Sequence, residues 1–349
     1  MKNNRIAIFQ YGPRHEEIVP SIAHAVISLG MECHVFINDK IPVLRGDIFS
    51  FLSNVEGVYI HWKDHSSRRG LADSIRSVKS IEPEHVIFST LQNHQSLDIA
   101  DELGVDYSGV VHNLQFLEAD ENLLKRLRLG PSHILTLSDS LRVRAHKYFS
   151  EGRVLTLFPH VLTDDIKTFN SFGGDFVRIA ILGSVNFSNR DYASLLEAAM
   201  EFKSEPLNFI VCGGGGDRNQ LISDVKRLKL SDKFSFLPLL KSGFTSYEDY
   251  FSALYSCQLV MPLALNKYIN KKITSSVPAA IAFSKPVMCT DLFMRTYDLP
   301  CAISGENAFE QIRQVLNIDA KWYFEARLKM QSMLLESLRV NVSSVSSIL

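Results

Sequence analysis

The hydroxyl residues Thr274, Ser275 and Ser276 mark the stretch of this sequence best suited to chemistry. A polar loop precedes them, and it holds three lysines: Lys267, Lys271 and Lys272. The proline and small apolar residues that follow indicate a short buried helix, and Ser or Thr directly before such a helix is an N-cap signal. Free N–H groups, hydroxyls and a nearby cation bind anions. The stretch therefore predicts a diphosphate site, centred on Lys272 and these hydroxyls; a capped helix beside solvated lysines is the alternative.

Residues 213–216 are consecutive glycines at the end of an apolar run that reads as a strand. No Lys-Ser or Lys-Thr pair follows them and their spacing is not G-x-G-x-x-G, so a P-loop is not indicated. Because glycine lets a ligand approach the backbone, Gly213 and Gly214 are predicted to face the base and ribose of a nucleotide; a plain turn is the alternative. Pro262 and Leu263 end another strand and are also predicted to face the base and ribose, since open α/β sheets bind ligands at the carboxyl ends of their strands.

The small-residue helix runs into residues 283–287 (FSKPV), and this combination resembles the donor-binding segment of GT-B glycosyltransferases. Many retaining members carry two glutamates around this helix, whereas this sequence has Lys271 and Ala279 at those positions. Variants of the superfamily with a Ser-Ser loop are more similar. The resemblance implies a nucleotide-sugar donor, UDP- or GDP-linked, with no further cofactor. It leaves the donor sugar and the retaining or inverting outcome open.

The resemblance also implies phosphate-binding roles for residues outside this stretch. It places Gly183, Ser184 and Arg190 in the first loop of the donor domain, where a glycine approaches the phosphates and a basic residue pairs with them. A guanidinium suits a diphosphate because it presents a planar fork of donors. It places Gly12, after the first strand, close to the same phosphates. An exposed arginine that caps a loop is the alternative for Arg190.

Two residues of the first half are candidates for catalysis. His112 follows a strand, and its segment VHN resembles one found at the cleft of many sugar-nucleotide transferases. An imidazole with an ordinary pKa can accept a proton or donate a hydrogen bond to the sugar. Glu16 is the rival candidate for the base, and His15 beside it is placed to contact the acceptor. The alternatives are a His112 that only bonds its own loop and a Glu16 that only favours a helix start.

Composition excludes several other classes of protein. The chain has 349 residues, 46% of them hydrophobic and 21% charged, with a net charge of −1, which does not favour nucleic-acid binding. The five cysteines form no CxxC pair and lie in or near apolar runs, so no disulfide framework and a reducing compartment are indicated. No His, Asp or Glu spacing indicates a metal site. The first residues read as a strand rather than a secretory signal, so we expect a cytoplasmic location.

Short apolar strands alternate with helices in both halves, which predicts two doubly wound, Rossmann-like α/β domains in the GT-B arrangement. The predicted boundaries are 1–165 for an acceptor-side domain, 166–176 for a linker and 177–320 for a nucleotide-sugar domain. A C-terminal helix is expected over 321–349. In GT-B enzymes such a helix commonly crosses back to the first domain, and the resemblance implies that this one could do so. Residues 340–349, rich in Ser and Val, are expected to be a frayed end of that helix.

The leading reading is a metal-independent hexosyltransferase that acts on a glycan or lipid-linked acceptor. A sugar-nucleotide epimerase of the same fold and a non-catalytic, two-lobed sugar- or nucleotide-binding protein are the alternatives. Peripheral contact with the inner face of a membrane is left open, because two groups of basic residues in the first half would suit anionic head groups. The groups are Lys63, Arg68, Arg69, Arg76 and Lys79, and then Lys125, Arg126 and Arg128.

Overall fold

The computed structural model of the chain describes residues 4–12, 15–46, 48–49, 52–160, 176–269, 274–299 and 301–349. These residues form two compact units. Unit 1 holds the described residues of Met1–Thr163 together with Leu335–Leu349, and unit 2 holds those of Asp164–Asn270 and Thr274–Leu334. Of the predicted linker 166–176, only Phe176 lies within the described residues.

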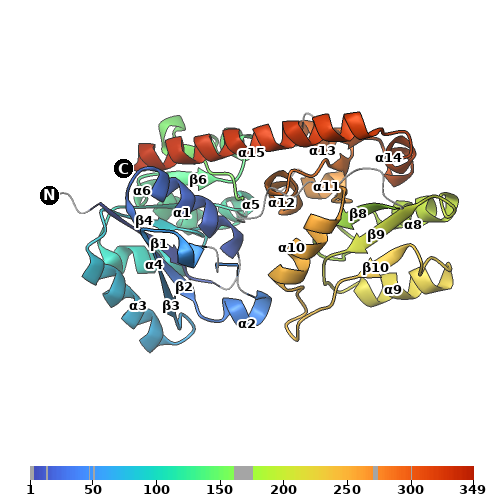
Figure 1. Ribbon diagram of the computed structural model, residues 1–349. Helices are drawn as coiled ribbons and strands as arrows, with labels where there is room; N and C mark the ends of the chain where they lie inside the picture. The colour runs from blue at the N-terminus through green and yellow to red at the C-terminus, as the bar shows by residue number, and fades with distance from the viewer. Residues whose placement is uncertain are drawn as a thin grey trace. The chain divides into compact units, whose positions relative to one another are not determined.

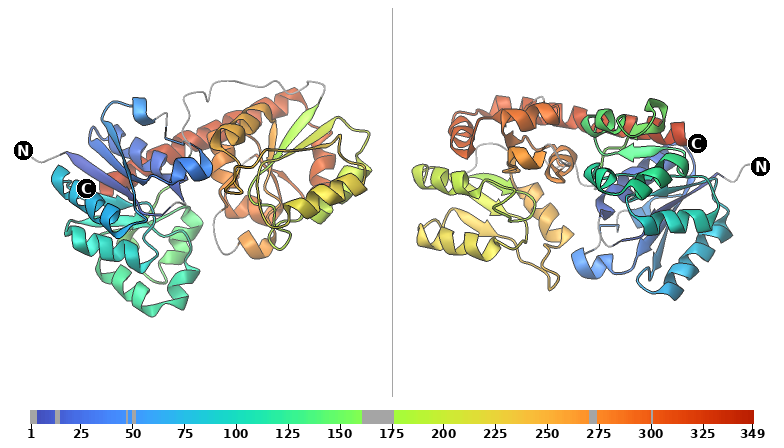
Figure 2. Two further views of the ribbon diagram at one scale, coloured as in Figure 1. Left: turned by 90° about the horizontal axis from the view of Figure 1, so that it is seen from below. Right: turned by 180° about the vertical axis from the view of Figure 1, so that it is seen from behind.

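Unit 1 is built on a parallel sheet with the strand order β3-β2-β1-β4-β5-β6-β7 (Figure 1). The order reverses at β1 and β4, and right-handed crossovers therefore place helices on both faces of the sheet (Figure 2). The strands are β1 (Arg5–Gln10), β2 (Glu32–Asn38), β3 (Val58–Lys63), β4 (His85–Phe88), β5 (Tyr107–Val110), β6 (Ile134–Thr136) and β7 (Val154–Thr156).

The connecting helices of unit 1 begin at polar caps. Ser67, Asn93, Asp120 and Ser138 each accept a hydrogen bond from the backbone N–H three residues ahead, which satisfies one free donor at each helix start. The helices are α1 (Val19–Ser28), α2 (Ile41–Arg45), α3 (Arg68–Ile81), α4 (His94–Leu103), α5 (Gln115–Ala119), α6 (Glu121–Leu129) and α7 (Asp139–Ala145), with 3₁₀ turns η1 (Glu16–Ile18), η2 (Leu52–Asn54) and η3 (Glu151–Arg153).

Unit 2 has its own parallel sheet, with the order β10-β9-β8-β11. A parallel bridge between Val260 and Val287 continues it toward β12 and β13. Its strands are β8 (Val177–Ile181), β9 (Leu207–Val211), β10 (Phe234–Phe236), β11 (Leu259–Met261), β12 (Met288–Cys289) and β13 (Ile303–Ser304). Its helices are α8 (Tyr192–Glu201), α9 (Arg218–Arg227), α10 (Tyr247–Ser256), α11 (Asn266–Ile269), α12 (Ser276–Ala282), α13 (Asp291–Thr296) and α14 (Ala308–Val315).

The predicted fold class is confirmed, with a separate doubly wound sheet in each unit. The apolar runs located the longer strands to within a few residues. The short elements α2, α5, α13 and β13 were not predicted, because pieces of two to six residues carry too little periodicity to be read. Among the described residues, none of the helices combines the length and the apolar character needed to span a bilayer.

The frayed end predicted for residues 340–349 is wrong. Helix α15 runs without a break over Ala320–Ile348, the long red helix of Figure 1. Asn341, Ser344 and Val345 are buried on it. Serine and valine have low intrinsic helix propensity, but burial of one helix face against unit 1 outweighs that preference.

The carboxyl half of α15 is joined to unit 1 by an unusual pair of hydrogen bonds. The Asn341 side chain accepts from the Phe158 N–H at 2.7 Å and donates to the Phe158 carbonyl at 2.9 Å, as a neighbouring strand would. Two residues on, the Ser21 hydroxyl makes the same two bonds to the backbone of His160. The chain that leaves β7 is therefore held on alternate residues by α15 and α1.

We predict that Asn341→Ala lowers the stability of unit 1 and leaves unit 2 unchanged. The substitution leaves two partly buried backbone groups of Phe158 without the Asn341 partner, which costs on the order of 1–3 kcal/mol. The two tryptophans separate the units, because Trp62 lies in unit 1 and Trp322 in unit 2. Urea unfolding followed by fluorescence in a Trp322→Phe background reports unit 1, and in a Trp62→Phe background it reports unit 2.

Ser343→Ala is the matched control, since Ser343 is exposed on the same helix. A fall in the Trp62 midpoint with Asn341→Ala but not with Ser343→Ala is expected. Equal unfolding midpoints for both variants in the Trp322→Phe background, where Trp62 reports unit 1, would show that the pair of bonds contributes nothing.

Candidate functional site

The candidate phosphate site lies at the point where the strand order of unit 2 reverses. Strands β8 and β11 are neighbours there, and their following connections run in opposite directions along the sheet. Loops that leave the carboxyl ends of two such strands diverge, which opens a crevice where ligands of α/β sheets bind. The loop after β8 contains Gly183, Ser184 and Arg190, and the loop after β11 contains Pro262 and Leu263. The structure thus gathers these five sequence-predicted residues at one edge.

Arg190 is the side chain that connects these two loops. It is only 5% exposed, and its Nη1 donates to the carbonyl of Pro262. Its backbone forms an isolated antiparallel bridge with Ala264. Gly183 has a φ of 92°, and a Cβ there would overlap the Arg190 guanidinium. A side chain at position 183 would therefore displace the arginine, which explains why glycine is required.

The hydroxyls of the 274–276 segment reach the same edge. Ser276 donates to the Leu182 carbonyl at 3.4 Å, and Thr274 donates to the Ser276 hydroxyl at 3.1 Å. Ser275 lies at the N-cap position of α12 but is exposed and makes no capping hydrogen bond. Thr274 takes that role instead and accepts from the Ser276 N–H. Lys272, the cation predicted to join them, lies outside the described residues.

Gly213, Gly214 and Gly215 face protein backbone at short range, whereas Gly216 has open space where a Cβ would stand. A Cβ on Gly213 would overlap the Gly183 carbonyl, and one on Gly214 would overlap the carbonyl of Gly243. Val185 N–H donates to the Gly214 carbonyl at 2.7 Å. These glycines let the loops after β8, β9 and β10 pack against one another. The predicted contact of Gly213 and Gly214 with base and ribose stays a prediction, and their observed neighbours are the adjoining loops.

A cavity of about 220 Å³ opens beside Arg190. Phe187, Tyr192 and Leu265 form part of its wall, and the rings of Phe187 and Tyr192 lie 5.8 Å apart. The wall is largely apolar, with Asp191 and Asp224 at its polar side. Unit 2 therefore has room for a small ligand group next to the cationic edge.

Lys285 of the FSKPV segment has a structural role that the sequence did not reveal. It is 2% exposed, and its ammonium donates to the carbonyls of Tyr255 at 3.3 Å and Cys257 at 2.7 Å. These carbonyls end helix α10, where the helix dipole favours a cation. Burial lowers the pKa of Lys285 to about 8. The lysine fixes α10 against the turn that follows α12.

The second candidate site lies where the strand order of unit 1 reverses, between β1 and β4. His112 follows β5 beside this point and is 7% exposed. Its Nε2 lies 2.8 Å from the Ser89 carbonyl and 3.1 Å from the Thr90 hydroxyl, both after β4. The Gln92 side-chain oxygen accepts from the backbone N–H groups of His112 and Asn113, each at 2.8 Å. Gln92 thus fixes the loop that carries the imidazole.

The contacts define the protonation of His112. A carbonyl only accepts, so Nε2 carries the proton and Nδ1 is the acceptor in the neutral ring. Burial, together with the neighbouring His15, lowers the pKa of His112 to about 3. The sequence argument assumed an ordinary pKa. With a pKa this low the ring is neutral near pH 7 and only weakly basic. It therefore suits a hydrogen-bonding role better than that of a base.

His15 brings the loop after β1 onto His112. The two imidazole rings stack with centroids 3.9 Å apart. His15 adopts a left-handed conformation with φ 67°, which is uncommon for a residue with a Cβ. Its Nδ1 lies 3.8 Å from the Glu17 carboxylate. Burial by itself would raise the pKa of Glu17, but His15 and Arg45 lower it to about 2, so Glu17 is ionised.

Glu16, the rival candidate for the base, is fully buried at the start of η1. Its Oε1 lies 3.3 Å from Nε of Arg45, the last residue of α2. An ion-paired carboxylate without solvent exposure is poorly placed to take a proton from a substrate. Gly12, in the same loop, has open space where a Cβ would stand, and its carbonyl accepts from the Gln10 side chain at 2.7 Å.

Two residues that the sequence did not single out hold the backbone of this loop. Asn38 donates to the Tyr11 carbonyl at 3.1 Å, and Nδ1 of buried His65 lies 3.0 Å from the Gln10 carbonyl. Asn38 ends β2, the neighbour of β1, and His65 follows β3, the next strand beyond β2. Neither residue belongs to a motif. The one signal that could have found them is their position at or just after a predicted strand end.

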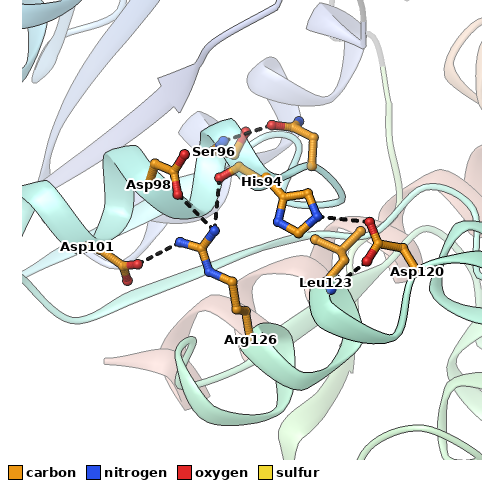
Figure 3. A network of polar contacts seen from close by, with 8 residues as sticks. His94, Ser96, Asp98, Asp101, Asp120, Leu123 and Arg126 are labelled. Atoms are coloured by element: carbon orange, nitrogen blue, oxygen red, sulfur yellow. Dashed lines mark hydrogen bonds and ion pairs between the residues drawn. The ribbon is translucent and has the colours of Figure 1, made fainter.

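The second basic group of unit 1 is partly neutralised. Arg126 on α6 pairs with Asp98 at 2.8 Å and Asp101 at 2.7 Å, both on α4, as Figure 3 shows. His94 pairs with Asp120, the cap of α6, at 2.8 Å. Arg126 therefore joins two helices and offers little charge to a ligand. Across the described ranges, no three His, Cys, Asp or Glu side chains are grouped so that they could hold a metal ion.

Comparison with protein-family models and with curated protein sequences yields no match. Solved structures do match over the whole chain. A glycosyltransferase from Rickettsia africae has a TM-score of 0.64 at 11% identity and covers 100% of this chain and 98% of its own. HepE from Anabaena, solved with UDP and glucose, has a TM-score of 0.66 at 12% identity, with 99% of each chain covered.

A protein from Listeria monocytogenes assigned as a UDP-N-acetylglucosamine 2-epimerase also matches, with a TM-score of 0.59 at 11% identity over 93% of this chain and 91% of its own. Identities of this size establish the fold alone. Together with the two doubly wound sheets, they confirm the architecture that the sequence predicted: the chain has the GT-B fold of nucleotide-sugar glycosyltransferases.

Proposed function

We propose that the chain is a glycosyltransferase that moves a sugar from a nucleotide-diphosphate-sugar donor to a glycan or lipid-linked acceptor. The observation that carries the proposal is the gathering of Gly183, Arg190, Thr274 and Ser276 at the switch point of unit 2. A planar cation, a loop without a side chain and two hydroxyls suit a diphosphate. The fold, shared with solved glycosyltransferases, supports the same reading.

In the proposed donor complex the diphosphate binds Arg190, Ser184, Ser275 and Ser276, with Lys272 as a second cation. These groups stabilise the charge that develops when the bond from the sugar carbon to the diphosphate oxygen breaks. They act where other transferases use a metal ion. We therefore propose a metal-independent reaction, with UDP or GDP as the carrier.

We predict that Arg190→Ala and Lys272→Ala each raise the dissociation constant of the nucleoside diphosphate at least about tenfold. The loss of one charge-assisted contact costs roughly 1.5–3 kcal/mol. Calorimetry with UDP, GDP, ADP and CMP identifies the nucleotide and then measures the variants in EDTA and in Mg²⁺. Arg178→Ala, which removes an exposed cation from β8, is the control. Unchanged affinity in both site variants would remove these residues from the site.

For the acceptor side we propose that His112 binds the donor sugar or the incoming hydroxyl through Nδ1. In the reaction the acceptor oxygen bonds to the anomeric carbon, the nucleoside diphosphate leaves with the bonding electrons, and the hydroxyl proton passes to a base. His112, neutral near pH 7, orients the hydroxyl or sugar. Glu16 would have to leave Arg45 to serve as that base.

We predict that His112→Ala lowers the rate of transfer by roughly 10²-fold or more while nucleotide affinity is retained. Glu16→Gln is measured beside it, and His133→Ala, a partly exposed histidine of the same unit, is the control. Because burial keeps the His112 pKa near 3, no step in the transfer rate from this group is expected between pH 5 and 8. Full transfer by His112→Ala would assign the chemistry to another group, with Glu16 first.

An epimerase of the same fold is the second candidate, supported by the Listeria match. An epimerase interconverts the sugar nucleotide without an acceptor, whereas a transferase releases the nucleotide when an acceptor is present. Incubation of UDP-hexoses with and without acceptor, followed by chromatography of the nucleotide products, separates the two. A non-catalytic binding protein would show neither product.

We further propose that unit 1 rests weakly on an anionic membrane through α5–α7. Phe116, Leu129 and Val143 are 53%, 77% and 61% exposed on these three helices. A bond from Arg128 Nε to the Tyr148 carbonyl, at 2.9 Å, and the pair of Lys147 with Glu118 tie their ends together. Exposed apolar side chains can enter the lipid surface, and basic residues beside them bind anionic head groups.

We predict that the protein co-sediments with phosphatidylglycerol liposomes at low salt and is released by about 0.5 M salt, because screened charges lose their attraction. Leu129→Ser is expected to weaken binding at low salt, and liposomes of neutral phosphatidylcholine are the control. No co-sedimentation with the anionic liposomes would remove the membrane contact from the proposal.

A further inference from the structure

Arg218 is a buried cation beneath the edge of unit 2, and the functional argument so far has not used it. It is the first residue of α9 and is 7% exposed. Its Nη1 donates to the carbonyl of Gly213 and its Nη2 to the carbonyl of Leu237. The guanidinium also lies 5.4 Å from the centre of the Phe236 ring. One side chain thus binds the backbone of two different loops.

The surroundings of Arg218 lack the partner that a buried arginine usually has. No carboxylate of the described residues forms an ion pair with it, and burial lowers its pKa. The desolvation of the charge is offset by the two carbonyls and the aromatic ring. A buried charge that binds only strand-end loops fixes the conformation of those loops.

The two loops leave neighbouring strands, β9 and β10, and they pack tightly. The Thr245 hydroxyl donates to the Cys212 carbonyl at 2.6 Å, and Gly214 approaches the Gly243 carbonyl so closely that a Cβ would not fit. In the strand order β10-β9-β8-β11, these loops lie on the far side of β8 from the switch point. A nucleoside that extends past β8 from a diphosphate at the β8 and β11 loops would meet the loops of β9 and β10.

We propose that Arg218 is a positioning residue for the nucleoside half of the donor. It holds the loops after β9 and β10 in the conformation that receives base and ribose, without touching the ligand. The proposal rests on the proposed function, since it requires a nucleoside diphosphate at this edge. It separates the site into two parts: Arg190 and the hydroxyls act on the diphosphate, and Arg218 acts on the nucleoside.

The test compares Arg218→Met, Arg218→Lys and wild type, with Arg227→Met as the matched control. Arg227 is exposed at the other end of the same helix and pairs only with Asp224 in the described residues. UDP, GDP and inorganic pyrophosphate are the probes, measured by calorimetry and as inhibitors of transfer. Circular dichroism and urea unfolding establish that each variant is folded.

For Arg218→Met we expect at least a tenfold weaker affinity for the preferred nucleoside diphosphate and less than a twofold change for pyrophosphate. The KM for the sugar nucleotide is expected to rise similarly, with kcat unchanged, because binding is lost equally in ground and transition states. Arg218→Lys should fall in between, since a lysine lacks the fork that binds two carbonyls. A general loss of structure would weaken both probes together.

Wild-type affinity for nucleoside diphosphate in a folded Arg218→Met would overturn the inference while leaving the proposed function intact. If Arg218→Met does not fold, Arg218→Lys decides, and unchanged nucleotide affinity in that variant also overturns it. Equal weakening for pyrophosphate and nucleotide contradicts the division of the site. Absence of nucleotide binding by the wild type rejects the proposed function itself.

Discussion

Buried cations that bind backbone carbonyls hold the loops at both edges of the unit 2 sheet. Arg190 and Arg218 act at the carboxyl ends of the strands, and Lys285 and Arg327 act at the amino ends. Arg190 binds the Pro262 carbonyl, Arg218 those of Gly213 and Leu237, and Lys285 those at the end of α10. Arg327 of α15 donates in the same way to the Ser284 carbonyl at 3.2 Å. Because a carbonyl at a strand or helix end has no partner in regular structure, a long cationic side chain satisfies it from a distance. The loops are thereby fixed without strands of their own.

The cations at the carboxyl ends of the strands, Arg190 and Arg218, also set the electrostatics of that edge. A cation paired with a carboxylate presents little net field, whereas a cation bound to carbonyls keeps its charge. The lowered pKa of Arg218 reflects the cost of burying that charge. An anionic ligand at the edge would recover part of this cost. The same contacts that order the loops therefore favour a diphosphate over a neutral ligand.

The sequence predicted what depends on local pattern and on residue type. Apolar runs placed the strands, and hydroxyls, glycines and one arginine placed the candidate phosphate site at their ends. It did not predict contacts that require distant parts of the chain. The burial that lowers the pKa of His112 comes from loops of three strands. Nor did the hydroxyl pattern decide between neighbouring residues, because Thr274 and not Ser275 caps α12. The helical residues 340–349 follow tertiary packing against their own propensity.

Helix α15 has a consequence for how the chain is made. Its residues 335–349 belong to unit 1, yet they are translated after unit 2. Unit 2 is synthesised almost completely before the helix that completes unit 1 emerges, so the first unit to be translated is the last to close. Until then the backbone of Phe158 lacks its Asn341 partner, while the Ser21 bonds to His160 can already form. A nascent chain of this protein therefore carries a unit 1 whose sheet is complete but whose closing helix is missing while unit 2 is being made.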